Sequence, residues 1–128
     1  MDQLVIAKTA RSPEIDFDFA ANRFAIRGES YPENVSAFFD EPLQRQEQHL
    51  NTLHDADVEF RFELIYFNSS TAKVLMELFE ALDAAAAHGN RVAVRWAYEE
   101  GDTNAQELGE EFGDELRHAS FCIEEVPA

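Results

Sequence analysis

Residues 58–67, near the middle of the chain, constrain the fold more than any other stretch. The first seven of them, V-E-F-R-F-E-L, alternate apolar and polar side chains, and apolar residues then continue through Ile65, Tyr66 and Phe67. Alternation indicates a strand with one buried face, and the continuous apolar end indicates burial on both faces. We therefore predict a central strand inside a sheet.

A polar run and a helical pattern follow this strand directly. Residues 68–71, N-S-S-T, all favour the start of a helix, and apolar side chains then recur at helical spacing. Gly89 and Asn90 end the pattern in the way that is usual for a helix C-terminus. The spacing predicts a helix over residues 69–88.

Strand and helix patterns alternate along the rest of the chain. We predict an opening hairpin, a helix that begins near Pro32 after a Ser30–Glu33 capping box, a third helix and two further strands. These segments are residues 15–19, 24–27, 32–50, 91–98, 105–116 and 120–126. Strands that alternate with helices need crossover connections, which favours a mixed, largely parallel sheet packed with about three helices. The chain is predicted to be a single α/β domain over residues 1–128.

Charge and apolar run length exclude several classes of partner. Ten Lys and Arg stand against 26 Asp and Glu, a net charge of −16. Nucleic acids and anionic membrane surfaces attract basic proteins, so we expect neither as a partner. The longest apolar runs are four residues, far below the roughly 20 that span a bilayer. We expect a cytoplasmic protein that makes no use of a membrane.

Few side chains have the spacing of a known cofactor or metal site. The five glycines form no phosphate-binding loop, and the four histidines form no metal-ligand set. Cys122 is the only cysteine, which excludes an internal disulfide, and its apolar neighbours predict a buried strand residue. We expect no cofactor and no metal.

One enzymatic alternative remains open at this point. His118 and the acids of the loop at residues 99–104 are suited to acid and base chemistry, with Glu99, Glu100 or Asp102 as the partner carboxylate. A small acid/base enzyme of this kind needs a pocket that gathers these groups and perturbs a pKa. The structure tests whether they meet.

Residues 66–73, Y-F-N-S-S-T-A-K, place three hydroxyls where a strand meets a helix. The simplest interpretation is capping, in which Asn68 or Ser69 accepts an N–H of the first turn and stabilises the helix by about 1 kcal/mol. The same geometry suits a switch. A helix N-terminus carries roughly half a positive charge and free N–H donors, so it can hold a phosphoryl group on a first-turn hydroxyl.

Five motifs, in this order, resemble the SiaC-type bacterial regulatory phosphoproteins, whose fold is similar to STAS-type anti-sigma-factor antagonists. They are T-A-R-S-P-E-I-D-F at residues 9–17, G-E-S-Y-P-E-N at 28–34, Y-F-N-S-S-T-A-K at 66–73, the tryptophan strand with its acidic loop at 96–102, and G-E-E-F at 109–112. The resemblance covers nearly the whole chain and implies a STAS-like domain.

The resemblance also implies a function. In the family, the hydroxyl just after the motif's Asn is phosphorylated by a dedicated kinase, and a PP2C-type phosphatase reverses the modification. That position is Ser69, with Ser70 and Thr71 as alternates. The dephosphorylated form is implied to bind and activate a diguanylate cyclase, which links it to cyclic di-GMP signalling and biofilm formation.

Two patches are the candidates for partner contact. The first surrounds Ser69, and the second is the run that precedes the first predicted helix. Their residues are Asn68, Ser70, Thr71 and Lys73 in the first patch and Tyr31, Glu33 and Asn34 in the second. A third hypothesis also remains open, in which the chain is a STAS-like binding scaffold that is not phosphorylated.

Overall fold

Residues 3–127, the part of the chain that the computed structural model describes, contain six strands in one sheet. Each strand lies beside its neighbours in the sequence, in the order β1-β2-β3-β4-β5-β6. The strands are β1 (Gln3–Ile6), β2 (Glu14–Asp18), β3 (Arg23–Ser30), β4 (Asp57–Phe67), β5 (Arg91–Glu99) and β6 (Ser120–Val126). The prediction of a central strand is confirmed, because β4 lies between β3 and β5.

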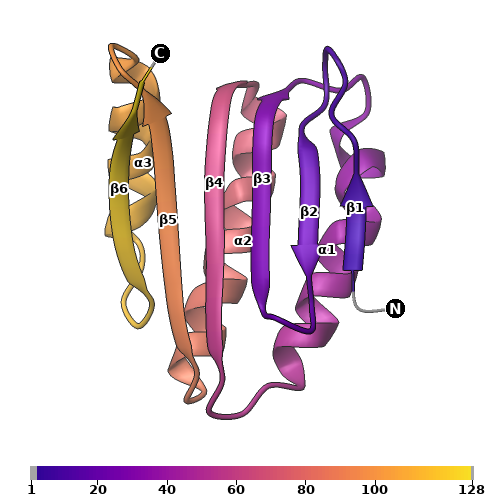
Figure 1. Cartoon of the computed structure of the whole chain (residues 1–128), viewed down its shortest axis with the longest axis vertical. Helices are drawn as coiled ribbons and strands as arrows, with labels where there is room; N and C mark the ends of the chain where they lie inside the picture. Colours follow the sequence, from indigo (N-terminus) through magenta and orange to yellow (C-terminus); the bar gives the residue numbers. More distant parts are fainter. Residues whose placement is uncertain (1–2, 128) are drawn as a thin grey trace.

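Three helices in the described residues pack on one face of the sheet (Figure 1). They are α1 (Val35–Asn51), α2 (Ser69–Ala87) and α3 (Thr103–Asp114). Each helix connects two parallel strands in the series β3 to β6, whereas β1, β2 and β3 are antiparallel neighbours. The predicted α/β class, with a mixed sheet and three helices, is confirmed.

The strand β1 was absent from the predicted order. Its sequence, Q-L-V-I, is too short for an alternation to be recognised. It is a strand because it pairs with β2, with Leu4 opposite Phe17 and Ile6 opposite Ile15. Pairing with a distant segment, rather than local pattern, defines this element.

The core between the sheet and the helices is largely aromatic. Phe60, Phe62 and Trp96 are all fully buried on the helix-covered face. The rings of Phe60 and Phe62 stack with centroids 4.4 Å apart, and Phe79 of α2 lies 5.0 Å from Phe62. This packing fixes the position of α2 over β4 and β5.

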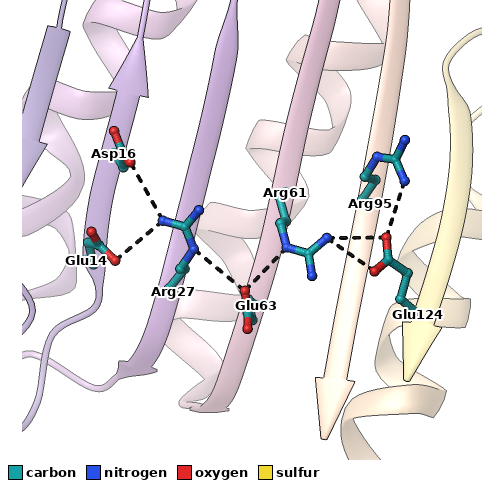
Figure 2. Close-up of polar contacts among 7 residues, drawn as sticks. All are labelled: Glu14, Asp16, Arg27, Arg61, Glu63, Arg95 and Glu124. Carbon is teal, nitrogen blue, oxygen red and sulfur yellow. Dashed lines mark hydrogen bonds and ion pairs between the residues drawn. The ribbon is translucent and has the colours of Figure 1, made fainter. Parts of the chain in front are cut away.

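The opposite face is uncovered and carries a row of alternating charges, which we call the open-face ladder (Figure 2). Arg27 of β3 lies 3.6 Å from Glu63 of β4, which also contacts Arg61 at 3.3 Å. Glu124 of β6 then contacts both Arg61 and Arg95, each at 3.3 Å. The ladder therefore ties four parallel strands together on the side that faces solvent.

The start of α1 differs from the prediction. α1 begins at Val35, and Asn34 caps it by accepting the N–H of Ala37 at 3.0 Å. The predicted capping box is wrong, because Ser30 is the last residue of β3 and is completely buried. Glu33 lies before the cap and is exposed.

The apolar end of β4 is not buried on both faces, contrary to the prediction. The exposed fraction is 47% for Ile65 and 53% for Tyr66. A register shift in β3 places Gly28 beside Leu64 but Glu29 beside Tyr66, so Ile65 has no opposite residue. The pairing with β5 also stops before this point. The two apolar side chains therefore reach the surface.

Cys122 is exposed, and the prediction of a buried cysteine is wrong. Its neighbours Phe121 and Ile123 point toward the core, which turns the Cys122 side chain outward beside Arg95. β6 is an edge strand, so a side chain on its open face has a neighbouring strand on only one side and otherwise faces solvent.

All three helices begin at the edge of the sheet where the parallel strands end (Figure 1). We call this the helix-start edge, and it comprises residues 31–34, 66–73 and 99–104. Within residues 3–127, no helix has the length and apolar character that crossing a bilayer requires.

Candidate functional site

The start of α2 is capped by Asn68, one of the two predicted capping residues. Its backbone is extended, and its side-chain oxygen accepts the N–H of Thr71 at 2.9 Å. An asparagine does this well because its short side chain reaches the orphan donors of the first turn. The cap makes Ser69 the first residue of α2.

A buried hydroxyl pair fixes this helix start to the end of β3. The hydroxyls of Ser30 and Thr71 lie 2.9 Å apart, and both residues are completely buried. The Thr71 hydroxyl also donates to the carbonyl of Ser30, and the N–H of Asn68 donates to the same carbonyl at 3.1 Å. A kinase reaches only an exposed hydroxyl, so this burial argues against Thr71 as a modified residue or as a direct partner contact.

Ser69 and Ser70, in contrast, are both exposed. Lys73 is exposed too, and it lies four residues after Ser69 on the same side of the helix. The first turn of α2 contains no acidic residue. A phosphoryl group on Ser69 would therefore meet the positive end of the helix and one cationic side chain, with no carboxylate in that turn to oppose it.

The second predicted patch lies directly beside the first. The rings of Tyr31 and Tyr66 meet edge to face with centroids 5.6 Å apart, next to the Ser30–Thr71 pair. Glu33 is exposed and lies 3.8 Å from Arg11. The sheet thus brings together two segments that are more than thirty residues apart in the sequence.

Two features of this site differ from the prediction. The sequence predicts Ser30 as a helix cap, but its hydroxyl anchors the start of α2 to β3, and nothing local distinguishes the two roles. The sequence also offers Thr71 as an alternate phosphorylation site, although it precedes Val74, Leu75 and Leu78 at helical spacing and therefore shares their buried side. That spacing was a signal that could have separated Thr71 from Ser69.

The acid/base alternative is wrong, because its residues lie at opposite ends of the sheet. Glu99 pairs with Val126 at the helix-start edge, whereas His118 precedes Ser120, which pairs with Ala93. The length of β6 separates them, about 20 Å at the rise of a strand.

Asp102 has a structural role at the same edge, since its side chain accepts the N–H of Ala105 and caps α3. The pKa of the Tyr98 hydroxyl is raised, mainly by burial and to a smaller extent by the negative charges of Glu125 and Glu110. Across the described chain, no three His, Cys, Asp or Glu side chains lie close enough together to hold a metal ion.

Comparison with known proteins shows which proteins this chain resembles. Residues 6–126 match the model of the SiaC family regulatory phosphoproteins. An uncharacterized protein of Pseudomonas aeruginosa strain UCBPP-PA14 is 32% identical over 115 residues, which cover 90% of both chains.

Solved structures agree over nearly the whole length. The crystal structure of apo-SiaC from Pseudomonas aeruginosa is 32% identical, with a TM-score of 0.87, and the match covers 97% of this chain and 99% of that one. A chain in the crystal structure of the diguanylate cyclase SiaD in complex with its activator SiaC, from the same organism, is 31% identical. Its TM-score is 0.89, and the match covers 96% of this chain and 99% of that one.

Proposed function

The chain belongs to the SiaC family of regulatory phosphoproteins, and from this premise we propose that it is a phospho-switch and not an enzyme. A protein kinase phosphorylates Ser69, and a PP2C-type phosphatase removes the phosphoryl group. The unphosphorylated chain binds and activates a diguanylate cyclase in the cytoplasm, which couples the switch to cyclic di-GMP and biofilm formation.

The observation that carries this proposal is the exposure of Ser69 on a helix start that is otherwise held firmly. Asn68 caps the first turn, and the Ser30–Thr71 pair anchors it to the sheet. The backbone around Ser69 is therefore presented in one conformation, while its hydroxyl is accessible. A fixed and exposed hydroxyl is what a kinase and a phosphatase both need to recognise.

The partner class is supported by a relative, since the Pseudomonas aeruginosa protein SiaC is described as the activator of the diguanylate cyclase SiaD. We place the contact at the helix-start edge, where the rings of Tyr31 and Tyr66 meet and where α2 begins at Ser69. Tyrosines suit such a surface because they supply a large contact area at a low cost in conformational entropy.

Phosphorylation is expected to release the cyclase. A phosphoryl group adds roughly −1.5 to −2 charge and considerable bulk at the centre of the contact. A docked partner would have to desolvate this charge, and Lys73 and the helix N-terminus would hold the group in place. The unmodified Ser69 hydroxyl imposes neither cost.

The experiment measures the affinity of a cognate diguanylate cyclase for four forms of the chain by calorimetry. The forms are the unmodified protein, the protein phosphorylated by its kinase, Ser69→Ala and Ser69→Asp. We expect phosphorylation to weaken binding by at least about tenfold. Ser69→Ala should bind normally and resist the kinase, and Ser69→Asp should weaken binding less than the phosphoryl group does.

Ser70→Ala is the matched control, because Ser70 is exposed in the same turn. It should still be phosphorylated, and phosphorylation should weaken its binding by the same factor as in the wild type. Equal affinities of the unmodified and phosphorylated proteins would refute the switch, and a phosphoryl group that survives in Ser69→Ala would refute the site. An intact mass without phosphorylation in the native cell would favour the scaffold hypothesis.

A further inference from the structure

A groove of about 530 Å³ lies between α2 and α3, away from the helix-start edge. Its floor and walls are apolar and include Phe79 of α2 and Phe112 and Leu116, which lie in and just after α3. α2 contributes Ala84 and Ala87, whose small side chains leave the space between the two helices unfilled. The groove is therefore a gap in the helical layer with an apolar lining.

Met76 marks the mouth of this groove and is 49% exposed. Methionine adapts to many apolar shapes because it is unbranched and polarizable, and it is common at surfaces that bind helices. About half of the Met76 side chain is therefore accessible to a partner that binds at the groove.

The charge around the groove defines the partner. Glu80, Glu111 and Glu115 are exposed on its two sides. Asp83 also borders the groove but accepts three backbone N–H groups at the turn before β6, and His118 closes the same end. The free rim is thus acidic, on a chain whose net charge is −16. Basic side chains on both sides of an apolar row would complement it.

The length of the groove fits a helix. Met76 and Ala87 are eleven residues apart on α2, which corresponds to about 16 Å, or three helical turns. A helix is about 10–12 Å wide with its side chains, so it would lie along the groove and insert its apolar row rather than sink into it.

We propose that the groove between α2 and α3 is a docking site for a basic amphipathic helix of a partner protein. The apolar row of that helix packs against Met76, Phe112 and Leu116, and its Lys or Arg side chains face Glu111 and Glu115. The site is separate from Ser69, so the chain can engage a second partner segment while the phospho-switch acts on the first.

The test uses a fluorescein-labelled peptide of roughly 16 residues built from Leu, Ala and Lys, with Leu at helical spacing. A second peptide of the same composition has its Leu residues scattered around the helix. Fluorescence anisotropy at physiological salt measures both against the full chain. We expect the amphipathic peptide to bind about tenfold more tightly than the scattered one.

Two double variants at the C-terminal end of α3 provide a matched comparison. Glu111→Lys with Glu115→Lys reverses the rim, whereas Glu110→Lys with Asp114→Lys makes the same change in net charge at exposed residues outside the groove. We expect the rim variant to lose about tenfold in affinity and the control to lose less than about twofold.

Met76→Ser is a third variant, which removes an apolar contact and changes neither the net charge nor a buried core residue. It should weaken the amphipathic peptide about threefold and lower the thermal unfolding temperature by no more than a few degrees, because serine forms helices slightly less well than methionine. Equal binding of the two peptides would overturn the proposal, as would equal losses in the two double variants. Either result would show that the acidic surface attracts cationic peptides without a specific site.

Discussion

The two faces of the sheet are stabilised in different ways. On the helix-covered face, Phe62 and Trp96 have no exposed surface and pack against rings from two helices. On the open face, the side chains of Arg61, Glu63 and Glu124 are 25%, 37% and 32% exposed and contact one another through ion pairs and hydrogen bonds. The same strands supply both sets, because successive side chains point to opposite faces.

The two faces of the sheet therefore contribute differently to the free energy of folding. Burial of apolar area contributes roughly 25 cal/mol per Å², whereas exposed ion pairs contribute about 0–1 kcal/mol each. Burial alone lowers the pKa of Arg61, but its hydrogen bonds to Glu63 and Glu124 and their charges raise it overall. Arg61 therefore stays charged in the ladder, while burial of the aromatic core supplies most of the free energy of folding.

The strongest test of this contrast removes one ring from the covered face. Phe62→Ala should lower the free energy of unfolding by about 3–5 kcal/mol, because it leaves a cavity among Phe60, Phe79 and Trp96. Urea unfolding followed by circular dichroism gives this value. A loss below about 1 kcal/mol would show that the core does not carry the stability.

A second test adds one methyl group to the covered face. A Cβ on Gly109 would overlap the indole ring of Trp96, whose N–H is held by the carbonyl of Ala105 at 2.9 Å. Gly109→Ala should therefore cost about 1–3 kcal/mol despite the gain in helix propensity. Glu110→Ala, exposed on the same helix, is the control and should change stability by less than about 0.5 kcal/mol.

A third test compares how much a charge beside the helix-covered face and a charge in the open-face ladder each stabilise the fold. Burial alone raises the pKa of Asp83, but hydrogen bonds from the backbone N–H groups of Ala119, His118 and Arg117 lower it overall. A depressed pKa adds stability above the unfolded value of 3.8, and this stability is lost as the pH falls through the folded pKa.

Asp83→Asn should accordingly cost about 1 kcal/mol at pH 7 and progressively less below the unfolded pKa, since both forms are then uncharged. Thermal unfolding of the two proteins from pH 7 to pH 2 measures the difference. A deficit that does not shrink as the carboxylate is protonated would mean that its charge is not the source of the stability.

The smallest effect is expected on the open face. Arg61→Met breaks the ladder at its centre, removing contacts to Glu63 and Glu124. It should change stability by less than about 1 kcal/mol, and the change should shrink further as salt is raised from low to about 1 M. If this variant lost as much as Phe62→Ala, the contrast between the two faces would be broken.

Much of the fold was predictable because its signals are local. The alternation in residues 58–64, the helical stripe through Leu75 and Leu78, and the asparagine before α2 each depend on a few neighbouring residues. Such patterns express backbone propensity and the period of burial, which act over one or two turns. The existence of these elements and the cap at Asn68 followed from them.

The helix-start edge, by contrast, depended on pairing between distant segments. β1 exists only through β2, and Ile65 and Tyr66 are exposed because β3 shifts register beside them. The local pattern favours burial of both side chains, and no nearby residue indicates that the register between β3 and β4 shifts at this point. For this reason, the sequence does not predict that Tyr31 and Tyr66 form an aromatic surface at the helix-start edge.

The polar run at residues 68–71 already shows that three hydroxyls follow Asn68 at the junction of a strand and a helix. Which of them solvent reaches depends on how α2 packs on the sheet. α2 turns its apolar stripe toward the sheet, and that rotation carries Thr71 inward onto Ser30 while Ser69 is left outside. Hydroxyl residues have similar helix-start propensities, so their chemistry alone does not distinguish them. Packing does, because a helix has only one orientation that buries its apolar side.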